Sequence, residues 1–170
     1  RATLSGRSDA GQYGGDDTIT AADGDLWIIG GDGADRITGA DGASVILGDN
    51  GRIGTDNALA LSVVETLDQQ YGAADVITTG NGTAIVLGGA GSDAVTLGAG
   101  DHTVLGDFGV LELTGGVRAT LSGRSDAGQY GGDDTVTAAD GNLWVIGGDG
   151  ADSILHSGGG GAILGDSGAI

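Results

Sequence analysis

The chain has 170 residues, of which 39 are glycine, and it contains no proline, cysteine or methionine. Acidic residues number 24 against six basic ones, for a formal net charge of −18, so the chain offers no basic patch for nucleic acid. Glycine without a Gly-X-Y period excludes collagen, and the regular spacing of apolar residues, 39% of the total, argues against disorder. No apolar stretch is long enough to predict a membrane span.

Nine-residue repeats run through three blocks of the sequence, at 12–47, 70–105 and 129–164. Each nonamer is a Gly/Asp turn followed by a short β-branched strand, as in QYGGDDTIT at 12–20. Two nonamers make one 18-residue coil with strands on two opposed sheets, and successive coils stack by about 4.8 Å, the strand spacing of a sheet. The sequence therefore predicts an all-β fold, a parallel β-solenoid (β-roll) of such coils.

A longer period of about 58 residues inserts β-hairpins between groups of coils. Segments 1–20 and 118–137 are identical except at Ile19 and Val136, so near-duplicate units alternate, and we expect an excerpt from a long tandem array. In chain order the prediction is the second half of a hairpin at 1–11, a β-roll unit at 12–51, a hairpin at 52–69, a second unit at 70–109, a hairpin at 110–128 and a third unit at 129–170.

The hairpin register is predicted from the pairing of side chains. A three-residue turn at 114–116 places Glu112 opposite Arg118, so that an acid faces a base. The matching register in the first hairpin pairs Ile53 with Leu61.

Three of the nonamers fit the pattern GGxGxDxUx, in which U is a large apolar residue: GGDGADRIT at 30–38, GGAGSDAVT at 88–96 and GGDGADSIL at 147–155. With the Gly-Asp turns, the hairpins and the Tyr-Gly restart that follows each of them (Tyr13, Tyr71, Tyr130), they resemble the hemolysin-type (RTX) calcium-binding repeats of giant secreted bacterial surface proteins. The resemblance implies type I secretion and folding on calcium outside the cell, where the ion is millimolar.

A hard cation such as calcium takes six to eight oxygen ligands. One Gly/Asp turn offers backbone carbonyls and one carboxylate, so two stacked turns are needed to complete a shell. Aspartates recur 18 residues apart on one edge, with further acids at the third turn position and in the Gly-Asp turns. The predicted calcium ligands are Asp17, Asp32, Asp35, Asp49, Asp75, Asp93, Asp107, Asp134, Asp149, Asp152 and Asp166. The alternative is that Asp and Gly are ordinary turn formers. On the opposite edge we expect few or no ions.

Strand alternation turns the eighth nonamer position inward and the seventh and ninth outward. On one sheet the outward residues are mainly threonines. On the other they form an apolar face larger than a soluble monomer normally exposes: Trp27, Ile29, Val45, Leu47, Ile85, Leu87, Trp144, Ile146 and Leu164. Either the hairpins fold over this face or a second chain packs on it, and the two are compatible.

These patterns predict a structural role: a calcium-stabilised segment of a secreted bacterial surface protein, serving as a stalk, a filament or an adhesin-like matrix fibre that self-associates. The alternatives are a secretion and folding module attached to a toxin or secreted hydrolase, and an ice- or surface-binding solenoid that uses the threonine sheet. We expect no enzyme activity, because no nucleophile–histidine pair recurs in the repeats and the paired aspartates are better used as ligands.

Overall fold

The structure is a computed structural model that describes residues 2–6, 14–125 and 129–170. Tyr13, the first of the three restart tyrosines, lies outside the described residues. The described part is built from strands and turns, with one short 3-10 helix, η1 (Gln69–Tyr71), so the fold is all-β as predicted. None of its helices has the length and apolar character to cross a membrane.

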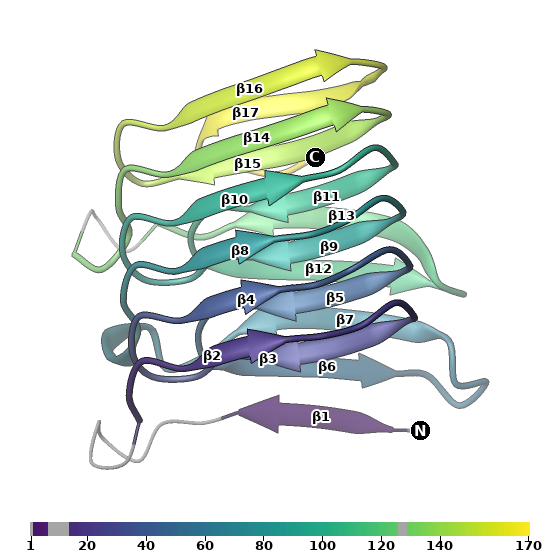
Figure 1. Ribbon diagram of the computed structural model, residues 1–170, viewed down its shortest axis with the longest axis horizontal. Helices are drawn as coiled ribbons and strands as arrows, with labels where there is room; N and C mark the ends of the chain where they lie inside the picture. The colour runs from purple at the N-terminus through teal and green to yellow at the C-terminus, as the bar shows by residue number, and fades with distance from the viewer. Residues whose placement is uncertain (1, 7–13, 126–128) are drawn as a thin grey trace.

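Two six-stranded parallel sheets form the body of the molecule (Figure 1). The first parallel sheet contains, in spatial order, β2 (Thr18–Thr20), β4 (Arg36–Thr38), β8 (Val76–Thr78), β10 (Ala94–Leu97), β14 (Thr135–Asp140) and β16 (Ser153–Gly158). The second contains β3 (Leu26–Ile29), β5 (Ser44–Leu47), β9 (Ala84–Leu87), β11 (His102–Leu105), β15 (Leu143–Gly148) and β17 (Gly161–Asp166). Each strand of the first sheet is followed in the chain by its neighbour in the second, and we call such a pair a coil.

The core between the two parallel sheets is a double row of β-branched side chains. The eighth-position residues of the inner coils are at most 1% exposed and belong to one buried cluster: Ile37, Ile46, Ile77, Val86, Val95, Val104, Val136 and Val145. Each such side chain contributes about 1.5–3 kcal/mol by leaving water. The inward direction of the eighth position, inferred from strand alternation, is therefore confirmed.

A third sheet is antiparallel and is built from the insertions between coils. Its order is β1-β6-β7-β12-β13, with β1 at Thr3–Gly6, β6 at Gly51–Thr55, β7 at Leu61–Thr66, β12 at Gly109–Thr114 and β13 at Val117–Gly123. The hairpins β6–β7 and β12–β13 are joined to each other because β7 pairs with β12, with Val64 opposite Leu111. Insertions that are far apart in the sequence thus form one continuous sheet.

The antiparallel sheet packs on the outward face of the second parallel sheet. A second buried cluster joins Leu47, Leu87 and Ile146 of the parallel sheet to residues such as Leu111 and Leu121 of the hairpins, and all five are fully buried. The hairpins of the chain itself therefore cover the middle of the predicted apolar face. At the two margins of this face, Trp27 is 39% exposed and Leu164 is half-buried. The Arg118 guanidinium covers the Trp144 ring, with its central carbon 3.8 Å from the ring centre.

The register predicted for the β12–β13 hairpin is wrong. The turn has two residues, Gly115 and Gly116, with φ of 60° and 80°, and it places Leu113 rather than Glu112 opposite Arg118. A two-residue turn with positive φ at both positions matches the twist of the flanking strands, and the Gly-Gly pair adopts it without strain. That preference outweighs the acid–base pairing on which the prediction depended.

A bulge in each hairpin restores the burial pattern further from the turn. In β12–β13 the register shifts after Leu113, so that Leu111 pairs with Leu121 and both reach the core. A shift in β6–β7 likewise pairs Ile53 with Val64, not with Leu61 as predicted. One extra residue on one strand changes the facing partner, and the sequence pattern alone did not indicate it.

Candidate metal-binding edge

A row of aspartates lies in the turns that lead into the strands of the first parallel sheet, and hydrogen bonds join it from coil to coil. We call this side of the stack of coils an edge. In each step the backbone N–H of one aspartate donates to Oδ1 of the aspartate in the next coil over 2.7–2.9 Å. The row, which we call the aspartate ladder, runs through Asp17, Asp35, Asp75, Asp93, Asp134 and Asp152. The structure thus brings six of the predicted ligands together in one line, on the edge where the 18-residue spacing placed them.

In five of the six ladder carboxylates the second oxygen has no protein partner. Oδ2 is buried and without a hydrogen bond in Asp35, Asp75, Asp93, Asp134 and Asp152. Four of these residues, all but Asp152, are only 1–2% exposed. A buried polar atom without a partner is costly, so five in one row require a common explanation.

Each of these oxygens faces a glycine that is the first residue either of a nonamer or of a Gly-Asp turn. A Cβ built on Gly88 would lie 2.2 Å from Oδ2 of Asp93 and 2.2 Å from the carbonyl oxygen of Gly106 in the next coil. The same cradle recurs at Gly30, Gly48, Gly106 and Gly147, with 2.0–2.2 Å to the carboxylate and 2.1–2.6 Å to the carbonyl. Beside each of these glycines a carboxylate oxygen and a carbonyl oxygen from successive coils therefore lie close together. A side chain on the glycine would fill the space between the two oxygens.

Burial makes the charged form of these carboxylates unfavourable. Desolvation raises the pKa of Asp75 to about 7 and that of Asp134 to about 8, and it raises the pKa of Asp93 well above its ordinary value. Neighbouring aspartates add like-charge repulsion in the same direction, although the backbone N–H bonds lower the pKa. The pKa values of Asp35 and Asp152 are raised chiefly by the same desolvation. At neutral pH the ladder is stable only if a cation or a proton offsets its charge.

Asp49 and Asp107, in the Gly-Asp turns, differ from the ladder because both of their oxygens accept backbone N–H bonds. Their donors lie in the unit that follows: the N–H groups of Ala73 and Ala90 for Asp49, and those of Gly132 (3.0 Å) and Asp149 (2.5 Å) for Asp107. Both residues are at most 4% exposed, and desolvation raises the pKa of Asp49 to about 8 and that of Asp107 to about 7. They fasten each unit to the next across the point where a hairpin leaves.

The remaining predicted ligands occupy more open positions. Asp166 is exposed, as is Asp17, the end member of the ladder at the opposite end of the stack. Asp32 accepts a bond from the Asn50 side chain, and Asp149 accepts bonds from the hydroxyls of Ser125 (2.9 Å) and Ser167 (3.3 Å). Asn50 and Ser167 were not singled out from the sequence, although each directly follows the aspartate of a Gly-Asp turn.

The opposite edge has a different chemistry. Its Asp and Asn side chains are exposed or nearly so and accept N–H bonds from the next coil, for example Asp41 from Asn81 at 2.6 Å and Asn142 from Gly160 at 3.0 Å. His102 is 2% exposed, and its ring nitrogens meet the N–H of Ala84 and the carbonyl of Gly98. No carboxylate oxygen of the described residues is buried without a partner on this edge.

The donor set of the ladder suits a hard cation. Within the described residues no three His, Cys, Asp or Glu side chains form a group that could hold a metal ion, so backbone carbonyls would have to supply most oxygens of each shell. Carboxylate plus carbonyl oxygen is the chemistry that calcium prefers, whereas zinc selects nitrogen and sulfur. The residues present therefore fit calcium.

Comparison with known proteins adds no relative. No family model, curated protein or solved structure matches this chain.

Proposed function

We propose that the two parallel sheets form a β-solenoid of the β-roll type, and that calcium ions along the aspartate ladder hold its coils together. The observation that carries this proposal is the row of five buried, unpartnered Oδ2 atoms, each beside a glycine that has no room for a side chain and near a backbone carbonyl oxygen. Bound calcium would supply positive charge where burial otherwise disfavours the carboxylates.

The two oxygens of each ladder aspartate have separate tasks in this proposal. Oδ1 accepts the N–H of the neighbouring coil and so fixes the side chain in one orientation, as Asp93 does for Asp75 at 2.7 Å. Oδ2 is then held toward the edge without freedom to turn away. The glycine carbonyl oxygens of the next coil would be further ligands of the same ion. Asp35, Asp75, Asp93, Asp134 and Asp152 would hold the ions.

The biological role that we propose is structural: a calcium-stabilised stalk, filament or matrix fibre of a secreted bacterial surface protein. Two features support it. The parallel register continues without a shift through both places where a hairpin leaves, as in the pairing of Ile37 with Ile77 and of Val95 with Val136. The antiparallel sheet then ties the hairpins together along the outside, which resists separation of the units.

The test compares two Asp→Asn variants that differ only in the edge they occupy. Asp93→Asn keeps an acceptor for the Asp75 N–H but removes the buried charge, whereas Asp41→Asn removes an exposed charge on the opposite edge. Thermal unfolding is followed by circular dichroism at pH 8 in millimolar calcium, in magnesium and in chelator.

Calcium should raise the melting temperature of the unmodified chain and of Asp41→Asn by the same amount. Calcium should raise the melting temperature of Asp93→Asn by less. In chelator this variant should melt at a higher temperature than the unmodified chain, because it no longer buries an uncompensated charge. Magnesium, which demands a smaller and more regular shell, should have little effect. An equal response of all three proteins to calcium would overturn the assignment to the ladder, and no response in any of them would overturn the calcium proposal.

A further inference from the structure

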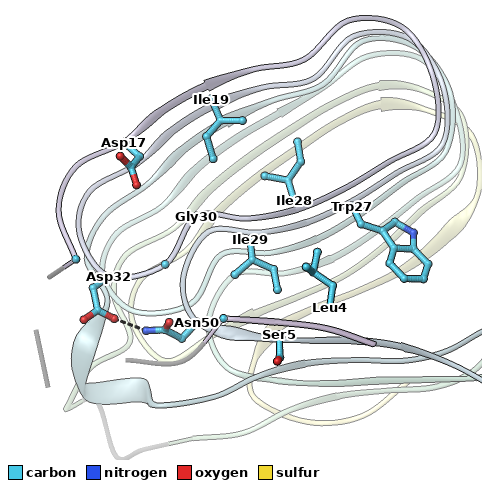
Figure 2. A pocket seen from close by; sticks show the side chains of 13 residues that line it. Leu4, Ser5, Asp17, Ile19, Trp27, Ile28, Ile29, Gly30, Asp32 and Asn50 are labelled. Carbon is cyan, nitrogen blue, oxygen red and sulfur yellow. Dashed lines mark hydrogen bonds between the residues drawn. The ribbon is translucent and has the colours of Figure 1, made fainter. Parts of the chain in front are cut away.

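A pocket of about 350 Å³ lies between the tip of the β12–β13 hairpin and the second parallel sheet. It is lined from the sheet side by β9, β11 and β15 and the turns before them, and further strands lie on both sides of these three (Figure 1). We call it the hairpin pocket. A larger pocket of about 650 Å³ lies at the first coil (Figure 2), but a preceding repeat in a longer array would fill it. The hairpin pocket, in contrast, is internal to the stack of coils.

The lining of the hairpin pocket combines an apolar surface with a few polar groups. Leu111 and Leu113 are buried, and Ile85 and Trp144 are half-buried. The exposed part of the lining is polar and includes Thr83, Asp101 and Asn142. Sites for small molecules have this composition, and their volumes are about 300–1,000 Å³. The pocket therefore has the size and lining of a small-molecule site.

Arg118 is the basic side chain of the hairpin pocket. Its guanidinium stacks on the Trp144 ring, 3.8 Å from the ring centre, and donates to the Thr103 hydroxyl at 2.8 Å. No carboxylate of the described residues forms an ion pair with it, whereas Arg52 in the other hairpin pairs with Glu65 at 2.7 Å. A guanidinium has five N–H donors. Arg118 is thus held in place by one donor, and other donors remain for a ligand.

The β6–β7 hairpin shows that the fold does not require this arginine. Both hairpins shift register at the same step, and Leu61 of β7 occupies the place that Arg118 has in β13. In the coil before each hairpin, Val45 occupies the place of Thr103. Leu61 and Val45 both belong to the second buried cluster. Since even partial burial of a charge without a countercharge is costly, packing alone does not explain an arginine and a threonine here.

Asp101 adds a negative charge to the same pocket. Desolvation lowers the pKa of Arg118, and the nearby charge of Asp101 opposes that shift, although the two side chains form no ion pair. Oδ1 of Asp101 accepts the backbone and side-chain N–H groups of Asn142 at 3.1 and 2.9 Å, and no described residue donates to Oδ2. The ring nitrogens of His102, which also lines the pocket, are taken up by backbone groups. The pocket thus offers one positive and one negative group that do not neutralise each other by contact.

We propose that the hairpin pocket binds a free α-amino acid with an apolar side chain. The ligand carboxylate would accept N–H bonds from Arg118, and its ammonium group would donate to Oδ2 of Asp101. The ligand side chain would lie against Ile85 and Leu113. Arginine and carboxylate form some of the strongest hydrogen-bonded pairs in proteins. A zwitterion also matches the two charges of the pocket, and the net charge of −18 does not repel it as it would an anionic polymer.

Two variants each remove one charged partner of the ligand. Arg118→Leu copies Leu61 of the other hairpin, so the fold should tolerate it. Asp101→Asn removes the negative charge but keeps an oxygen that can accept the Asn142 N–H bonds. Arg36→Leu removes an exposed arginine of the first parallel sheet and serves as the control.

Isothermal titration calorimetry in millimolar calcium measures binding, and circular dichroism confirms that each protein is folded. L-Leucine should bind the unmodified chain and Arg36→Leu equally, and it should bind Arg118→Leu and Asp101→Asn about tenfold more weakly or less, because each lacks one charge-assisted hydrogen bond. Leucinamide lacks the carboxylate, N-acetyl-leucine lacks the ammonium group and free glycine lacks the apolar side chain, so each should bind the unmodified chain more weakly than leucine. N-acetyl-leucine should bind Asp101→Asn no more weakly than the unmodified chain.

Absence of leucine binding to the folded, unmodified chain would overturn the proposal, as would unchanged binding to Arg118→Leu. Equal affinity of the unmodified chain for leucine and N-acetyl-leucine would overturn the assignment to a free amino acid, and equal affinity for glycine would overturn the requirement for an apolar side chain. The inference is independent of the calcium proposal, because the pocket uses no residue of the aspartate ladder.

Discussion

The backbone N–H of Asp75 donates to Oδ1 of Asp93 at 2.7 Å, while Oδ2 of Asp93 lies buried without a partner. One half of the carboxylate is therefore used by the fold, and the other half is left for something that the polypeptide does not supply. The same division recurs along the ladder and leads to the predictions that follow.

The stability of the chain in chelator should fall as the pH rises from about 4 to about 8. Asp75 and Asp134 have an ordinary pKa of 3.8, raised in the folded state to about 7 and about 8. The folded state therefore binds more protons than the unfolded state in this interval, so each such group removes about 1.4 kcal/mol of stability per pH unit. Urea unfolding at a series of pH values measures the slope, which calcium should flatten. Stability that rises with pH in chelator would contradict the raised pKa values.

Gly88→Ala should destabilise the chain by about 1–3 kcal/mol and abolish the calcium response of that level of the ladder. The added methyl group would lie 2.2 Å from both Oδ2 of Asp93 and the carbonyl oxygen of Gly106. Gly165→Ala is the matched control, since a Cβ there meets nothing within 4 Å, and it should change stability by less than about 0.5 kcal/mol. Chemical denaturation measures both. Equal effects would show that the space beside Asp93 is not needed.

Leu121→Ala should cost about 2–5 kcal/mol, because Leu121 is fully buried between the antiparallel sheet and the second parallel sheet. Val117→Ala, at the tip of the same hairpin and 71% exposed, should be nearly neutral. If denaturation showed both substitutions to be neutral, the hairpins would not cover the apolar face.

Arg118→Gln should expose the Trp144 ring and shift its fluorescence emission to longer wavelength. The guanidinium lies 3.8 Å from the ring centre and donates to the Thr103 hydroxyl at 2.8 Å, and such a stacked cation contributes about 0.5–1 kcal/mol at a partly exposed site. Arg36→Gln, on the first parallel sheet, is the control and should leave the emission unchanged. An unchanged spectrum for Arg118→Gln would mean that the arginine does not shield the ring.

The parts of the molecule that the sequence predicted are those with a fixed period. The two-residue alternation of strands places Ile37 and Val95 inside, and the 18-residue recurrence brings Asp17 beside Asp35. Both follow from local geometry that every coil repeats, so they require no knowledge of distant contacts.

The parts that escaped prediction depend on contacts without a period. The sequence named Asp49 as a calcium ligand but did not indicate the two backbone donors of its oxygens, which lie 24 and 41 positions further on. The pairing of Val64 with Leu111 joins two hairpins that no local signal connects. The β12–β13 register was missed because the turn has two residues instead of three and a bulge between Glu112 and Leu113 adds a further shift.

The most direct test of the account is calorimetric titration of the unmodified chain with calcium near pH 7, in two buffers that differ in ionisation enthalpy. If calcium replaces protons on the buried carboxylates of the ladder, binding should release protons, so the apparent enthalpy should differ between the buffers. That difference should vanish as the pH is raised well above 8, where the carboxylates are already ionised. Absence of calcium binding, or binding with the same enthalpy in both buffers near pH 7, would contradict the account.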